Sequence, residues 1–336
     1  MNEAACTTDL NLFELDRCRW LQEHGGSMEG FTTKHGAILA EHGAISESLK
    51  AHLKIPAFFD TLVLTSENRG LLGASLNSDD GASERISDYA VSSARSFVGQ
   101  MFCVDLSSVI VIRARKQVMP ANALGTVYSH AVYHHVIVVP EFSFDPMGIL
   151  VRQFAIAAHY TCMRQKPGLA ALMTDNLTQS MVGHYALLRF ASLHPEECAV
   201  MRHLQLMVSW EFAKGLSKTP QMPMGFVASD LGGQLMRDYG GGMFKAVMTD
   251  LYESMTHGQA IWFGSNNFTG MVLALTFLGD DHGMTQFMRI DSGDRALADK
   301  ITEAFPGIRP LAFEQCFAGF NAQLARMIQL GTARAA

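Results

Sequence analysis

The sequence predicts an α+β protein that is predominantly helical, with a small mixed sheet packed on the helical body. Two segments, Ser107–Arg113 and Ala131–Val139, are dense in β-branched residues and are predicted as strands. From Pro146 onward the sequence has a helical pattern almost throughout. Strands followed by a long run of helices are typical of α+β folds with segregated elements.

The order of the elements begins with helices over Leu10–Leu53. There the sequence His35-Gly36-Ala37-Ile38 recurs seven residues later, which keeps both isoleucines on one face of a short amphipathic helix. Another helix is expected near Glu84–Gln100, before the first strand. Ala131–Val139 carries so many β-branched residues that we expect it to be buried within the sheet.

After the second strand, Asp145 is predicted as an N-cap with Pro146 at the first helical position, and Pro167-Gly168 ends that helix. Further helices are expected over Asp175–Leu193, Pro195–Lys214, Ala228–Asp238, Met243–Met255, Phe268–Leu278, Arg295–Phe305 and Leu311–Leu330.

The domain organisation is predicted from one polar, glycine-rich run, Gly70–Ser83. Such a run favours a loop between a helical N-terminal region, residues 1–83, and an α+β domain, residues 84–336. A single domain is the alternative, since 336 residues can form either.

The composition argues against several kinds of partner. The net charge is −6 and no basic stripe is present, which argues against nucleic acid. No apolar run approaches the roughly 20 residues that span a bilayer. The polar, acidic N-terminus is unlike a secretory signal, and six cysteines without CxxC spacing indicate a cytoplasmic protein with reduced thiols. With 48% hydrophobic and only 17% charged residues, a homodimer is consistent with the composition.

The first helix after the strands invites comparison with the zinc motif HExxH. In that motif two histidines four residues apart grip one zinc ion, and the glutamate activates the metal-bound water. Here Ala155 and Ile156 replace the first histidine and the glutamate, and only His159 remains. Ordinary zinc-activated hydrolysis therefore cannot come from this helix.

The surrounding segments nevertheless resemble the core of gluzincin peptidases of the thimet oligopeptidase and oligoendopeptidase type. A buried strand runs into the helix through a short acidic turn, and His184 follows His159 by twenty-five residues, near the position of the third ligand in those enzymes. Leu177–Phe190 is similar to their second ligand-bearing helix, and Met224–Met248 to the glycine-punctuated helices that follow. The resemblance covers about residues 105–255 and implies a zincin-like protein that has lost its catalytic residues.

The resemblance implies a former peptidase cleft that binds a peptide, a protein segment or a small ligand. Candidate cleft residues are His130, His134, Glu141, His159 and His184. No cofactor is expected, with zinc held by His159 or His184 as the exception. Two alternatives remain open: a metal-dependent enzyme using the four histidines of this set, and a helical adaptor or regulatory protein unrelated to peptidases.

Each candidate also has a plain structural interpretation. His159 and His184 can be hydrogen-bonded core histidines. If His130 and His134 share one strand, their Cα atoms lie about 13 Å apart, too far to bind one metal without another ligand between them. His203 and Glu211 lie on about the same helix face and are expected to be solvated.

Three glycine- or polar-rich spots have similar explanations. Gly183, in the middle of a helix, is expected to permit the close approach of another helix. The run Tyr239–Lys245 is predicted as a hinge or a tight turn between helices, rather than a phosphate site. Ser265–Asn267 is predicted as a cap before Phe268.

Overall fold

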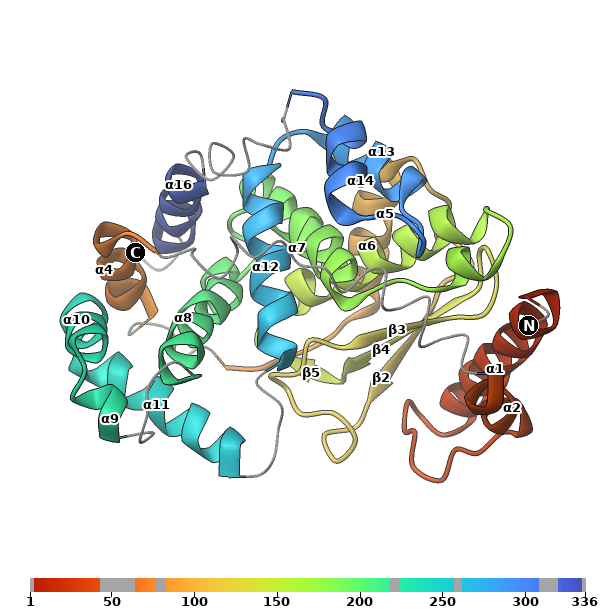
Figure 1. The fold of residues 1–336 in the computed structure, drawn as a ribbon, viewed down its shortest axis with the longest axis horizontal. Helices are drawn as coiled ribbons and strands as arrows, with labels where there is room; N and C mark the ends of the chain where they lie inside the picture. The colour runs from red at the N-terminus through yellow and green to blue at the C-terminus, as the bar shows by residue number, and fades with distance from the viewer. Residues whose placement is uncertain are drawn as a thin grey trace.

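The computed structural model describes residues 3–42, 64–76, 82–217, 224–256, 262–307 and 320–333. These residues form a predominantly helical α+β fold with a small mixed sheet (Figure 1). The elements follow one another as α1 (Glu3–Glu23), α2 (Lys34–His42), α4 (Ser66–Leu76), β1 (Glu84–Arg85), α5 (Asp88–Phe102), β2 (Ile110–Ala114), β3 (Thr126–Ser129), β4 (His135–Pro140), β5 (Phe142–Ser143), α6 (Pro146–Arg164), η2 (Leu169–Leu172), α7 (Asn176–Leu193), α8 (Val200–Ser217), α9 (Met224–Val227), α10 (Asp230–Tyr239), α11 (Gly241–Thr256), α12 (Trp262–Thr276), α13 (Asp281–Ile290), α14 (Leu297–Ala304) and α16 (Phe320–Ala333).

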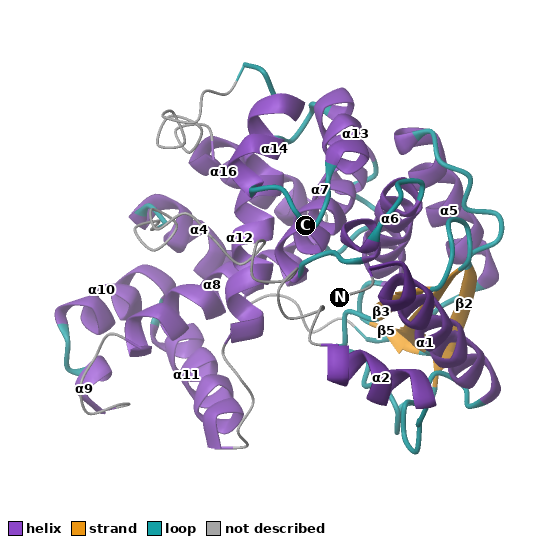
Figure 2. Cartoon of the chain, turned by 45° about the vertical axis from the view of Figure 1, so that its right-hand side comes forward, coloured by secondary structure: helices purple, strands orange, loops and turns teal. Residues whose placement is uncertain are grey.

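The main sheet has the strand order β2-β4-β3, with β2 parallel and β3 antiparallel to β4. Every residue of β4 is buried, as the β-branched sequence predicted. Its side chains alternate between two layers. Val136 and Val138 pack with Leu21 of α1, whereas Ile137 and Val139 belong to the large core shared with α5 and α6. Figure 2 shows α1 in front of the sheet.

The helical body is held by close contacts between helices. Helix α7 packs between α6 and α12, and both contacts depend on a glycine. A Cβ at Gly183 of α7 would lie 2.9 Å from Arg152 Cγ, and one at Gly270 of α12 would lie 2.6 Å from Ser180 Cβ. The prediction that Gly183 permits a close approach is confirmed. Helices α4, α10, α11 and α16 gather at the end of the molecule away from α1 (Figure 1).

The structure confirms the predicted N-cap Asp145, and Asp175 caps α7 in the same way. Asp145 and Asp175 each accept a backbone N–H three residues later, at Gly148 and Thr178. Gly240 has φ +83° and is the single residue between α10 and α11, so the predicted tight turn between helices is confirmed. Helix α6 ends at Arg164, before the predicted Pro167-Gly168 stop.

Several predicted boundaries are wrong. Gly70–Leu76 was expected in a loop but belongs to α4, because Arg69 anchors this helix to α8 and α10 through Glu211 and Asp238. Ser265–Asn267 lies inside α12 instead of capping it. Helix α13 was not predicted, and α8 begins at Val200, five residues after Pro195.

Other expectations are only partly covered. The predicted Leu10–Leu53 helices appear as α1 and α2, with residues 43–53, including most of the second His-Gly-Ala-Ile copy, outside the described residues. Residues 311–319 of the last predicted helix, Leu311–Leu330, also lie outside the described residues. The division at residue 83 stays a prediction. Among the described helices, none is long and apolar enough to cross a bilayer.

Candidate functional site

Helix α6 is fixed at its N-terminus by a buried hydrogen-bond cluster. Asp145 Oδ2 accepts a hydrogen bond from His203 Nε2 at 2.7 Å and another from Cys198 Sγ. A Cβ at Gly148 would lie 2.9 Å from His203 Nε2, so glycine is needed there. Burial alone would raise the pKa of Asp145, but His203 and the backbone N–H groups of Ala199 and Gly148 together outweigh it and lower the pKa.

The expectation that His203 and Glu211 form a solvated face is wrong. Both side chains are buried, at 6% exposure each. They also contact different elements, since His203 bonds to Asp145 while Glu211 accepts from Arg69 and from the hydroxyl of Tyr239. His203 and Glu211 therefore belong to two separate buried hydrogen-bond networks on α8.

His159 lies in a buried ion network at the other end of α6. Its Nε2 is 2.8 Å from Asp291 Oδ2, and Lys300 Nζ is 2.5 Å from Asp291 Oδ1, with all three side chains fully buried. Lys166 Nζ donates to the backbone oxygen of Asp291. Burial opposes ionisation of Asp291, but His159 and Lys300 together lower its pKa below the usual value. His159 Nε2 is therefore already bonded to a carboxylate.

His184 is also buried, at 1% exposure, but it has no hydrogen bond from either ring nitrogen to a described residue. Burial, together with the charges of Arg152 and His203, holds the pKa of His184 well below its usual value. The imidazole is therefore neutral at neutral pH.

His159 and His184 do not belong to any cluster with metal-ligand geometry among the described residues. The one group of three ligand-type side chains within reach of a common ion there is His194, Glu196 and Glu197, just after α7. That group contains none of the predicted cleft residues.

His130 and His134 lie in the turn between β3 and β4 rather than on one strand. Their rings stack with centroids 5.4 Å apart, and His130 N donates to His134 O. The predicted 13 Å separation is wrong because Tyr128–Val139 is a hairpin. His135 begins β4 and contacts Ser129 and Thr161 through its two ring nitrogens, and burial lowers its pKa to about 3.

Glu141 lies apart from these histidines. Its carboxylate is 3.3 Å from Arg85 Nε, and it lines a pocket of about 340 Å³ with Lys116, Phe142 and Phe144. The structure thus brings His130 and His134 together, but does not gather the five predicted cleft residues in one site.

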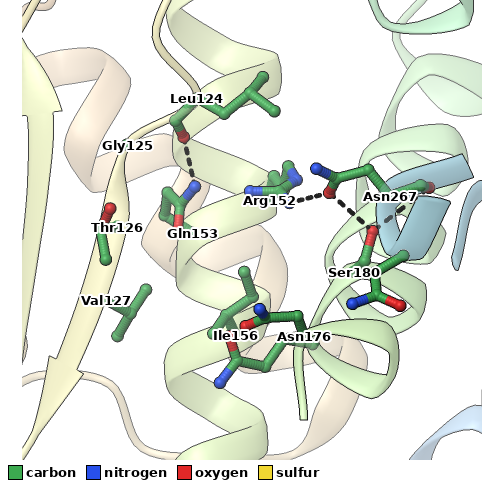
Figure 3. A pocket seen from close by; sticks show the side chains of 12 residues that line it. Leu124, Gly125, Thr126, Val127, Arg152, Gln153, Ile156, Asn176, Ser180 and Asn267 are labelled. Atoms are coloured by element: carbon green, nitrogen blue, oxygen red, sulfur yellow. Dashed lines mark hydrogen bonds between the residues drawn. The ribbon is translucent and has the colours of Figure 1, made fainter. Parts of the chain in front are cut away.

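A different pocket, of about 280 Å³, lies in front of α6 (Figure 3). It opens between the start of β3 and the helices α6, α7 and α12. The lining residues are Leu124, Gly125, Thr126, Val127, Arg152, Gln153, Ile156, Asn176, Gln179, Ser180, Asn266 and Asn267. Ile156, which the sequence comparison aligned with the glutamate of HExxH, lines this pocket.

The polar groups of this pocket are only partly bonded. Arg152 Nη2 donates to Asn267 Oδ1 at 3.3 Å, and the same oxygen accepts from Ser180 Oγ at 3.0 Å. Gln153 Nε2 donates to the backbone oxygen of Leu124. Arg152 Nε and Gln153 Oε1 have no hydrogen-bond partner among the described residues.

Arg152 is the one charged side chain among the described residues that line this pocket. It is 7% exposed, and desolvation lowers its pKa to about 10. At neutral pH it remains a cation. Sequence reasoning missed Arg152 and Gln153, although a polar pair inside the apolar helix Gly148–Ala158 was a signal, since buried polar groups need a partner.

The chain was compared with protein-family models, curated proteins and solved structures, and none of them matched.

Proposed function

We propose that this protein is a non-catalytic, zincin-like binding protein that holds a peptide, a protein segment or a small ligand in the pocket in front of α6. The observation that carries the proposal is the pocket itself. It lies against the helix that resembles the zinc-binding helix of gluzincins, with Ile156 at the position of the general base. Its size is near the lower end of the roughly 300–1,000 Å³ of small-molecule sites.

The chemistry of the helix supports binding without cleavage. Hydrolysis of a peptide by a zincin needs a metal-bound water and a carboxylate to deprotonate it. The side chain of Ile156 can neither bind a metal nor deprotonate water. His159 Nε2 is hydrogen-bonded to Asp291 in a fully buried site. Amide and hydroxyl groups from Gln153, Gln179 and Ser180 line the pocket instead. Such groups bind peptide bonds without activating them.

The arrangement of the elements also supports the proposal. The short strand β3 is at the edge of the sheet and lines the pocket with Thr126 and Val127, next to Gly125 just before the strand. An edge strand next to a pocket can pair with an extended segment of a ligand. Helices α6 and α7, which carry His159 and His184, pack against each other directly.

Retention of peptides tests this proposal. The protein is incubated with a mixture of synthetic peptides of two to six residues and separated by gel filtration, and both fractions are analysed by mass spectrometry. We expect intact peptides to be retained by the wild type and lost in Asn176→Trp, which places a large ring at an exposed lining position. Tyr89→Trp, at an exposed position of α5, is the matched control and should retain the peptides.

Two results would contradict this proposal. One is the absence of any retained peptide, or retention that Asn176→Trp does not reduce. The other is the appearance of cleaved peptides together with about one zinc per chain that is lost in His159→Ala. That result would favour the metal-dependent enzyme.

A further inference from the structure

We infer that the pocket in front of α6 recognises a carboxylate, with the guanidinium of Arg152 as its partner. The carboxylate is the free C-terminus of a short peptide or the acid group of a small molecule. This inference rests on the proposed function, because it names the chemical group that the same pocket binds.

The first argument is the charge of Arg152. A buried cation is costly unless a counter-charge and hydrogen bonds compensate it. Two other buried cations have such partners: Arg69 contacts Glu211 and Asp238, and Lys300 contacts Asp291. Arg152 has no carboxylate within ion-pair distance among the described residues, and desolvation is the one cause of its lowered pKa. A bound anion would supply the missing charge.

The second argument is geometry. Close packing holds the stem of Arg152, because Gly183 lies against its Cγ. Asn267 takes one of the guanidinium donors, while Nε is left without a partner among the described residues. The planar guanidinium matches a carboxylate by two parallel hydrogen bonds. Figure 3 shows Arg152 and Asn267 side by side, with Ser180 also bonded to Asn267.

The third argument is the acceptor on the neighbouring residue. Gln153 Oε1 is buried and has no hydrogen-bond partner in the part of the chain that the structure describes. Since Gln153 Nε2 is already bonded to Leu124 O, the amide orientation is fixed and Oε1 is the free end. An acceptor beside a cation matches the last residue of a peptide, which offers an amide N–H and a terminal carboxylate.

Charge and size favour a carboxylate over a phosphate. The pocket has a single charged lining residue, which balances one negative charge. A phosphate group carries about −1.5 to −2 at neutral pH, more than the single charge of Arg152 balances. The volume of about 280 Å³ admits a small acid or the end of a peptide, and not a folded partner.

The test compares the same peptide mixture with free C-termini and with C-terminal amides, using the gel-filtration assay and calorimetry of the retained peptides. We expect the amides to bind about tenfold to a hundredfold more weakly, the usual effect of losing a hydrogen bond to a charged group. Arg152→Gln should reduce the affinity for the peptides with free C-termini to that for the C-terminal amides. Arg164→Gln is the control, because Arg164 is equally buried on α6 but contacts Ser129 outside the pocket.

Acetate, benzoate and inorganic phosphate are titrated as separate probes. Binding of acetate or benzoate that displaces the peptide, and is lost in Arg152→Gln, would identify a small acid as a sufficient ligand. Peptide acids that bind while acetate and benzoate do not would identify the peptide C-terminus.

Equal binding of acids and amides, abolished by Asn176→Trp, would overturn the carboxylate inference and leave the proposed function intact. Phosphate that binds as tightly as the acids would also overturn it. No binding of either peptide form would refute both.

Discussion

Asp291→Asn tests whether the network around His159 is a structural ion cluster. Among the described residues, Asp291 carries the negative charge that pairs with Lys300 and contacts His159, and all three side chains are fully buried. Asparagine keeps the shape but removes the charge, so Lys300 becomes a buried cation without a counter-charge. Breaking a buried pair in this way costs about 3–5 kcal/mol of unfolding free energy.

The assay is urea unfolding followed by circular dichroism at pH 7. Adding Lys300→Met to Asp291→Asn should recover most of the loss, because the uncompensated charge is then gone as well. Glu303→Gln is the matched control, because Glu303 lies on α14 together with Lys300. Its ion pair with Arg295 is 35% and 48% exposed, so its loss should cost at most about 1 kcal/mol.

The same urea unfolding, repeated at acid pH, supplies a second check. The folded-state pKa of Asp291 lies below its unfolded value of about 3.9. Its contribution to stability is therefore complete above that pH and is lost as the pH falls further. If Asp291→Asn and Glu303→Gln lose equally little stability, or if the double variant is less stable than Asp291→Asn, the reasoning is refuted.

Three further predictions concern single sites. Arg152→Met should raise the unfolding free energy by about 1–3 kcal/mol, because it removes a buried charge without a counter-charge; a lower midpoint in urea would contradict this. His135 has a folded pKa of about 3, against about 6.5 when unfolded, so stability falls by about 1.4 kcal/mol per pH unit below pH 6. His135→Asn should reduce that slope in unfolding curves between pH 6 and 4, and an unchanged slope would refute the assignment. Gly270→Ala should lower the unfolding free energy by about 1–3 kcal/mol through overpacking, since the new Cβ would lie 2.6 Å from Ser180 Cβ. An increase of about 1 kcal/mol, as helix propensity alone gives, would show that α7 and α12 can move apart.

The strands and caps near α6 could be predicted because local signals agree there. The β-branched run in β4 has only one well-packed solution, a strand buried on both faces. Asp145 followed by Pro146 is a start signal that depends on neighbouring residues alone. The turn at His130–His134 was missed because it lacks glycine and proline, and its residues have the β propensity of the strands around it.

The contacts that define the candidate site could not be predicted, because they join distant parts of the chain. Asp291 is 132 residues from His159, and Asn267 is 115 residues from Arg152. Nothing in the spacing of one sequence links such positions. Gly70–Leu76, the second part of α4, was mistaken for a loop for a similar reason, since the anchoring of Arg69 overrides the weak local helix propensity.

That same anchoring affects how the protein is made. Arg69 of α4 contacts Asp238 of α10, 169 residues later, and Asn68 contacts Asn321 of α16. At the usual 5–20 residues per second of synthesis, the ribosome needs roughly 10–30 s to add the residues between Arg69 and Asp238. During that interval α4 has left the ribosome without its neighbours, and its apolar face is available to chaperones. Helix α4 can therefore make these contacts only after α10 and α16 have been synthesised.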